Sequence, residues 1–121
     1  MPKIIRTELG NVSIAEDVIA TVAGMAAMDC YGLIGMVSRK QVKDSFNEFL
    51  GRENPGRGVE IRILDERLFV DVYIIVSYGT KISEVAHNVM DKVRYTLQDM
   101  LGIEVSAVNV IVQGVRVPEE R

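Results

Sequence analysis

The sequence lacks a second cysteine and lacks a long apolar segment at its N-terminus. Its 121 residues include one cysteine, Cys30, so no internal disulfide can form. Residues 1–6 have no apolar core of the kind that a secretion signal requires. We therefore expect a cytoplasmic protein that relies on a hydrophobic core rather than on covalent cross-links.

The chain also lacks an excess of positive charge. It has 14 Lys and Arg residues against 17 Asp and Glu residues, which gives a formal net charge of -3. Domains that bind nucleic acid through its phosphates are usually basic and gather their Lys and Arg residues on one face. The composition therefore disfavours a nucleic acid as the partner.

No group of residues combines a nucleophile, a base and metal ligands. His87 has no second imidazole or cysteine at ligand spacing, which favours a plain surface residue. Cys30 has no base fixed near it by the sequence and is better explained as a small buried hydrophobic residue. Asp65 and Glu66 fall in an expected turn, where a solvated loop is favoured over an acid and base pair. We expect no catalysis, no cofactor and no metal.

One glycine-rich segment, residues 51–58, has the glycine spacing of a phosphate loop. A phosphate loop continues with Lys and then Ser or Thr and leads into a helix, whereas Arg57-Gly58 leads into an expected strand. Pro55-Gly56 fits a turn, because Pro fixes the first central residue and Gly accepts positive φ at the second. Anion binding by Arg52 and Arg57 is the weaker alternative.

What the sequence does contain is the pattern of one α+β domain, which we place at residues 1–117, followed by a frayed tail at residues 118–121. A first helix is expected to begin at Ser13, because Ser13 and Glu16 fit a capping box. From Val18 to Met28 this helix carries no charge, so it must be covered on several sides. The uncharged run is shorter than the roughly 18 apolar residues that cross a bilayer, which predicts no direct membrane insertion.

Small residues recur along this first helix in two pairs spaced four apart. The four positions are Ala20, Ala23, Gly24 and Ala27. Tight packing inside the monomer is the favoured interpretation, and close approach of a second subunit is the alternative.

The remaining elements follow from periodicity. We expect a short buried strand at residues 33–37, a short amphipathic helix at residues 42–50, and a hairpin of residues 59–64 and 68–78 joined by a four-residue loop. A second long helix at residues 83–100 ends at Gly102, and a last strand contains residues 108–112. Together they predict two long helices on one face of a mostly antiparallel sheet, a two-layer sandwich.

Alternation assigns the even positions of the second hairpin strand to the core and its odd positions to the opposite face. With residues of the last strand, that opposite face is too apolar for a plain wet surface and too polar for a core. The candidate interaction surface comprises Phe69, Asp71, Tyr73, Ile75, Asn109, Ile111 and Gln113. We expect the short helix, a second subunit or a partner protein to cover it.

Five short motifs, in order, resemble the bacterial alkaline shock protein family, also called the envelope stress response family. They are Gly10-x-Val12-x-Ile14 before an alanine-rich helix, Gly58-Val59, Tyr78-Gly79-x-x-Ile82, Gly102-x-x-Val105, and the segment of residues 108–115. The resemblance implies a small cytoplasmic, non-catalytic scaffold protein that forms homo-oligomers and docks on a protein partner. In some members a separate membrane-anchor protein holds the protein at the membrane, and the family supplies no catalytic residues.

The alternative is a nucleic-acid or small-ligand binding module, because α+β sheets also serve that purpose. Phe69 and Tyr73 could stack on bases. However, Glu60 and Asp71 stand beside them, and only Arg62 is available to attract phosphate.

Overall fold

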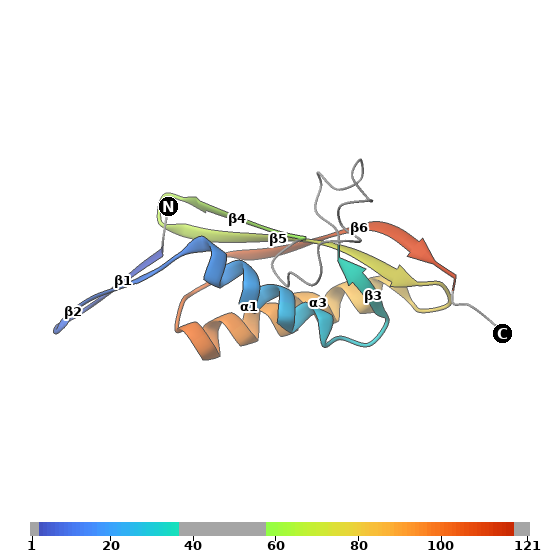
Figure 1. The fold of residues 1–121 in the computed structure, drawn as a ribbon, viewed down its shortest axis with the longest axis horizontal. Helices are drawn as coiled ribbons and strands as arrows, with labels where there is room; N and C mark the ends of the chain where they lie inside the picture. Colours follow the sequence, from blue (N-terminus) through green and yellow to red (C-terminus); the bar gives the residue numbers. More distant parts are fainter. Residues whose placement is uncertain (1–2, 37–57, 118–121) are drawn as a thin grey trace, which may run out of the picture.

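The computed structural model describes residues 3–36 and 58–117 and contains two long helices and two β-sheets (Figure 1). The α+β class expected from the sequence is therefore correct. The expected short helix at residues 42–50, the turn at Pro55-Gly56 and the tail at residues 118–121 lie outside the described residues.

The larger sheet is built around one long central strand, β5 (Arg67–Ser77). Strands β4 (Val59–Leu64) and β3 (Leu33–Met36) both pair antiparallel with β5, β4 along its first half and β3 along its second half. Strand β6 (Ala107–Arg116) pairs with β5 in parallel over nearly its whole length. Because a strand has two edges, β3 and β4 share one edge of β5 and β6 occupies the other.

The parallel pairing of β6 is a feature that the sequence patterns did not predict. Between β5 and β6 the chain forms helix α3 (Ile82–Thr96), which carries it back along the sheet. A strand that follows such a helical crossover enters the sheet parallel to the strand before it. The sheet is therefore mixed rather than a simple antiparallel meander.

The β4–β5 hairpin has the register that alternation predicts, but its turn is shorter. Val59 lies opposite Val72, and Leu64 lies opposite Arg67, so two residues form the turn instead of four. These residues, Asp65 and Glu66, have φ angles of 50° and 66°. Two successive positive φ angles are typical of a type I′ turn, whose twist matches that of the strands. The expected loop of four residues and the observed turn of two residues are both even in length. The side chains of β4 and β5 that were expected to share a face therefore do so.

The even positions of β5 form the centre of the core. Their side chains are fully buried and pack with residues of α1 (Glu16–Met28) and α3. Figure 1 shows the two helices together on one side of the larger sheet. The buried even positions of β5 are Leu68, Val70, Val72, Ile74 and Val76.

The N-terminal end of α1 contradicts the expected capping box. Ser13 belongs to strand β2 (Gly10–Ile14), where it lies opposite Ile4 of strand β1 (Lys3–Thr7). Helix α1 begins at Glu16, and its N-cap residue makes no side-chain capping hydrogen bond. The capping prediction is wrong because hairpin pairing holds Ser13 in an extended strand. The β1–β2 hairpin projects from one end of the body (Figure 1).

Helix α3 ends as expected, at Gly102. The last turn, residues Leu97–Leu101, is a π-helix, and Gly102 follows it with a φ of 69°. A π turn contains one extra residue, which rotates the following side chains relative to an α-helical pattern. As a result Leu101 packs against the core, whereas Met100, which the 3.6-residue period assigns to the core, is 64% exposed.

Candidate functional site

The side of the larger sheet away from α1 and α3, here called the outer face, carries the predicted interaction residues. Asp71 lies beside Asn109 in the β5–β6 register, and Tyr73 lies beside Ile111. After Val112 the register shifts by one residue, which leaves Gln113 without a partner in the β5 register. The structure therefore places the predicted residues on two neighbouring strands.

Asp71 is the centre of a polar cluster on the outer face. Arg62 donates two hydrogen bonds to its carboxylate, each 3.0 Å long, and the Asn109 amide donates a third at 2.9 Å. The Arg62 guanidinium also lies over the ring of Phe69, 5.2 Å from its centroid. The hydrogen bond to Asp71, and then the charge of Asp71, raise the pKa of Arg62 further.

This cluster neutralises its own charges. A paired Arg62 has less to offer a phosphate than a free guanidinium, because its donors are already bonded to a carboxylate. These hydrogen bonds therefore give no support to phosphate binding by Arg62, the cation that the sequence analysis considered for that role.

Tyr73 is the main correction to the predicted surface. Its side chain is 8% exposed rather than open to solvent, and its hydroxyl donates to a carboxylate oxygen of Glu60 at 3.3 Å. Phe69, Ile75 and Ile111 are half-buried, while Asn109 and Gln113 are exposed. The accessible part of the outer face thus excludes Tyr73 and combines aliphatic, Phe and amide side chains with the exposed Arg62 of the polar cluster.

The second predicted surface, the small residues of the first helix, lies inside the molecule. Ala23 and Ala27 are fully buried in the core, Gly24 is also buried, and Ala20 is half-buried. The favoured interpretation, packing within the monomer, agrees with this placement. These residues do not form an accessible surface for another subunit.

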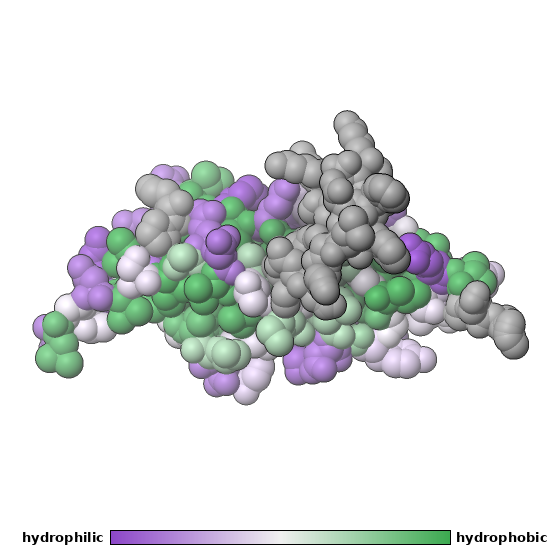
Figure 2. Space-filling model, in the orientation of Figure 1, coloured by the Kyte–Doolittle hydropathy of each residue, from purple (hydrophilic) through white to green (hydrophobic). Residues whose placement is uncertain are grey.

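Helix α1 instead has an exposed apolar stripe that the sequence interpretation missed. Val18, Met25 and Met28 are exposed, and their spacing of seven and three residues places them on one side of the helix. Figure 2 shows hydrophobic residues gathered over α1. The sequence feature that could have indicated this stripe is the absence of charge between Val18 and Met28. Without charged residues, the sequence does not show which side of the helix faces solvent.

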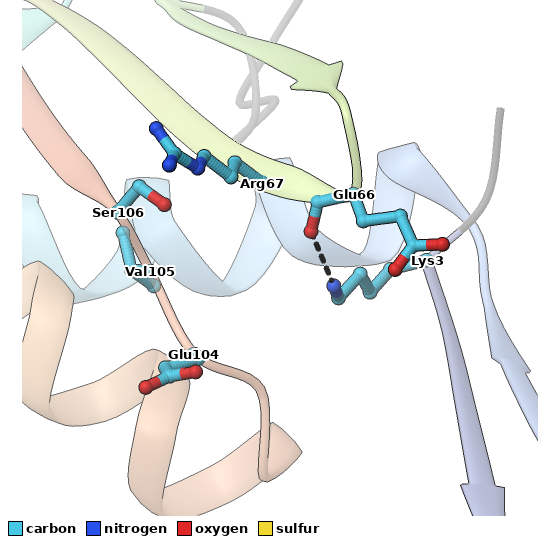
Figure 3. Close-up of a pocket in the computed structure, with 6 residues that line it drawn as sticks. All are labelled: Lys3, Glu66, Arg67, Glu104, Val105 and Ser106. Atoms are coloured by element: carbon cyan, nitrogen blue, oxygen red, sulfur yellow. Dashed lines mark hydrogen bonds between the residues drawn. The ribbon is translucent and has the colours of Figure 1, made fainter.

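One pocket of about 270 Å³ lies where the β4–β5 turn meets the start of the chain and the segment before β6 (Figure 3). The Lys3 ammonium donates to the backbone oxygen of Glu66 at 3.1 Å. Two cationic and two anionic side chains line the pocket, so it selects no ligand by the sign of its charge. The lining residues are Lys3, Glu66, Arg67, Glu104, Val105 and Ser106.

The isolated reactive residues occupy unremarkable positions. His87 is exposed and lies 3.4 Å from the Asp91 carboxylate, one helical turn away. Burial raises the pKa of the Cys30 thiol, and its Sγ donates weakly to the Ala26 carbonyl at 3.8 Å. A raised thiol pKa reduces the thiolate fraction that makes a cysteine reactive.

Within residues 3–36 and 58–117, no three His, Cys, Asp or Glu side chains gather as a metal site. No helix in the described part of the chain is long and apolar enough to cross a membrane.

Comparison with known proteins identifies relatives along nearly the whole chain. A model of the ASP23 family, cell envelope-related function, matches residues 4–117. The uncharacterized protein YloU of Bacillus subtilis (strain 168) is 56% identical over 113 residues, which cover 93% of this chain and 94% of the relative. The uncharacterized protein Spy1614 of Streptococcus pyogenes serotype M6 is 41% identical over 116 residues, which cover 96% of each chain.

Among solved structures, a variant of MamM-CTD superimposes with a TM-score of 0.50. The match covers 82% of this chain and 96% of that one at 11% sequence identity. At this identity the similarity concerns the fold alone.

Proposed function

Because the chain belongs to the ASP23 family, which has a cell envelope-related function, we propose that it is a non-catalytic interaction protein that self-associates and docks on a protein partner. The sequence resemblance to the alkaline shock protein family is confirmed by the family match and by the bacterial relatives. The proposed setting is the cytoplasm, where a membrane-anchor protein is one partner that the family resemblance implies.

The observation that carries the proposal is the composition of the outer face. Half-buried Phe69, Ile75 and Ile111 lie among exposed Asn109 and Gln113 on two neighbouring strands. The Asp71–Asn109 pair lies between Phe69 and Ile111 in the register, so the face mixes apolar and polar side chains, as surfaces that bind proteins do.

The Asp71 cluster supports a protein partner over a nucleic acid. The carboxylate and the Arg62 guanidinium bond to each other, so the pair presents little net charge. A surface of this kind does not depend on releasing counterions from phosphates, which supplies much of the affinity of nucleic-acid complexes.

Site-specific photo-crosslinking in the native bacterium tests the proposal. A photoreactive amino acid replaces Phe69 or Ile111 on the outer face, and Tyr95, an exposed aromatic residue of α3, is the matched control position. We expect protein adducts from positions 69 and 111 and none of the same adducts from position 95. Mass spectrometry of the adducts identifies the partner or a second copy of the chain.

Identical adduct patterns at all three positions would show that the outer face is not a specific surface. Adducts that nuclease treatment removes would instead support the nucleic-acid alternative. Light scattering of the purified protein tests self-association separately, since the expected mass is a multiple of the 13.5 kDa chain.

A further inference from the structure

Strand β6 has an edge that no other described strand covers. It pairs with β5 along one side, from Ala107 to Arg116, and within residues 3–36 and 58–117 it has no second partner. A free edge offers a row of backbone donors and acceptors to any extended chain that reaches it.

Protein sheets usually protect such an edge by making the strand short or by adding charges or proline. The opposite edge of this sheet follows that rule, because β3 has four residues and β4 carries Glu60 and Arg62. In contrast, β6 has ten residues, contains no proline, and carries no charge before Arg116. Its only irregularity is the register shift at Gln113. The β6 edge is therefore the less protected edge of the sheet.

The backbone hydrogen bonds of β5 show which backbone groups point outward along this edge. The Tyr73 N–H donates to the Gly58 carbonyl at 2.8 Å, so the backbone groups of Tyr73 face β4. Those of Val72 then face β6, because successive residues of a strand alternate. In a parallel pair, Val72 bonds to the two residues that flank its register partner, Val110. The backbone groups of Val110 itself must therefore point away from β5.

The same alternation applies to Val108 and Val112 on either side of Val110. These three residues present their N–H and carbonyl groups to the free edge, and their side chains lie on the face that packs on the helices. An antiparallel strand centred on Val110 would pair Val110 with its own equivalent and Val108 with the equivalent of Val112.

We infer that the self-association proposed above occurs through this edge, with β6 of a second copy pairing antiparallel to β6 about a two-fold axis at Val110. A two-fold axis uses the same patch on both subunits, so the patch must be complementary to itself. The β6 segment meets this condition because residues 107–115 are uncharged and place no like charges opposite each other. Asn109 then lies opposite Ile111 of the second copy.

This pairing also determines how the outer faces combine. Directly opposed residues of paired strands point to the same side of a sheet. Even residues pair with even residues, so the helices of both subunits lie on one side and the two outer faces join into one surface on the other. A dimer would thus offer a partner a continuous surface that includes Phe69, Ile75 and Ile111 twice.

The test replaces Val110 by proline and compares it with Val110→Ala. Proline removes an N–H that points away from β5, so it disrupts pairing along the free edge while the β5–β6 ladder remains. Alanine removes the side-chain packing alone. By light scattering over a concentration series, we expect Val110→Pro to have half the wild-type mass or less and Val110→Ala to keep it. Circular dichroism checks that both variants are folded.

A cross-linking experiment covers the case in which Val110→Pro does not fold. In a Cys30→Ala background, the double variant Asn109→Cys and Ile111→Cys places one cysteine opposite the other across the proposed axis. The separation of directly opposed residues, about 4.5–5.5 Å between Cα atoms, suits a disulfide. Oxidation should give a covalent dimer, whereas Asn109→Cys alone, whose cysteines are diagonal, should give none.

A folded Val110→Pro variant with wild-type mass, or a double-cysteine variant that stays monomeric on oxidation, would overturn the inference. If the wild type is oligomeric in that case, the proposed self-association stands and only the β6 edge is wrong. A wild type that is monomeric at every concentration removes both, but it does not affect the photo-crosslinking test of the outer face.

Discussion

Helices α1 and α3 share one side of the sheet but are built on different principles. Helix α3 alternates buried Val85, Val89 and Val93 with a charged outer side, so its sequence defines which side faces the core. Helix α1 uses small residues for close packing and leaves Met25 and Met28 exposed. The comparison teaches that periodicity orients a helix only when its outer side is polar, because the contrast between the two sides carries the information.

The largest loss of stability is expected from a charged residue on the buried side of α1. Ala23→Glu places a carboxylate at a fully buried position with no room for a longer side chain. An unpaired buried charge costs several kcal/mol, against a total stability of about 5–15 kcal/mol. We expect loss of the folded state by circular dichroism and thermal melting.

The matched control is Met25→Glu, two residues along the same helix, where the side chain is 60% exposed. It should keep a melting temperature close to that of the wild type. Two equally stable variants would mean that the inner and outer sides of α1 are not as described.

A smaller effect is expected at the end of α3, where the π turn changes which side chain enters the core. Leu97→Ala removes a fully buried side chain, which typically costs about 2–5 kcal/mol. Met100→Ala removes an exposed one and should change stability by less than about 0.5 kcal/mol. Urea unfolding of both variants measures the difference. A cost at Met100 comparable to that at Leu97 would show that Met100 also enters the core, as it would in a continuous α-helix.

The smallest effect concerns the ion pair that joins the two helices. Lys92 of α3 lies 3.5 Å from the Asp29 carboxylate at the end of α1, and both side chains are largely solvated. Exposed pairs contribute about 0–1 kcal/mol, so Lys92→Met should change stability little. Burial raises the pKa of Cys30, and the positive charge of Lys92 partly opposes this rise.

Removal of Lys92 should therefore raise the Cys30 pKa further and slow its alkylation by iodoacetamide at mildly alkaline pH. Lys3→Met is the control, because the Lys3 ammonium bonds at the β4–β5 turn, and it should leave the rate unchanged. The sign for stability follows from the raised pKa. The folded protein favours the neutral Cys30 thiol. The contribution of this preference to the free energy of unfolding is fully present below the pKa of Cys30 in the unfolded chain, and it is lost as the pH rises through the pKa of Cys30 in the folded protein. Faster alkylation in Lys92→Met would contradict this account.

Local patterns predicted the parts of the fold that local chemistry decides. The faces of the β4–β5 hairpin follow from alternation, and the end of the second helix follows from Gly102, whose positive φ suits glycine. The capping box at Ser13 failed because the pairing of β2 with β1 holds Ser13 in an extended strand. Pairing between strands depends on a partner segment, which a local pattern around Ser13 does not contain.

The candidate site was predicted in the same uneven way. Alternation placed Asp71, Asn109 and Ile111 on one face, and the structure brings them onto neighbouring strands. Burial of Tyr73 and the direction of β6 depend on how distant segments meet, and no spacing within one strand reports that. The exposed stripe on α1 could be predicted only in part. The sequence shows that Val18 to Met28 carry no charge, but it does not show which side of the helix the core leaves exposed.

The crossover through α3 also determines the order in which the sheet can form. A two-residue turn brings β4 and β5 together at little cost in loop entropy, whereas β6 joins β5 only after the chain has traversed the whole of α3. Contacts between distant segments form late in folding when their closure is costly. We therefore expect a folding chain to pass through a stage in which the edge of β5 is open and β6 is unpaired. At that stage we expect the open edge of β5 to be the site at which β6 of another copy can be exchanged for its own.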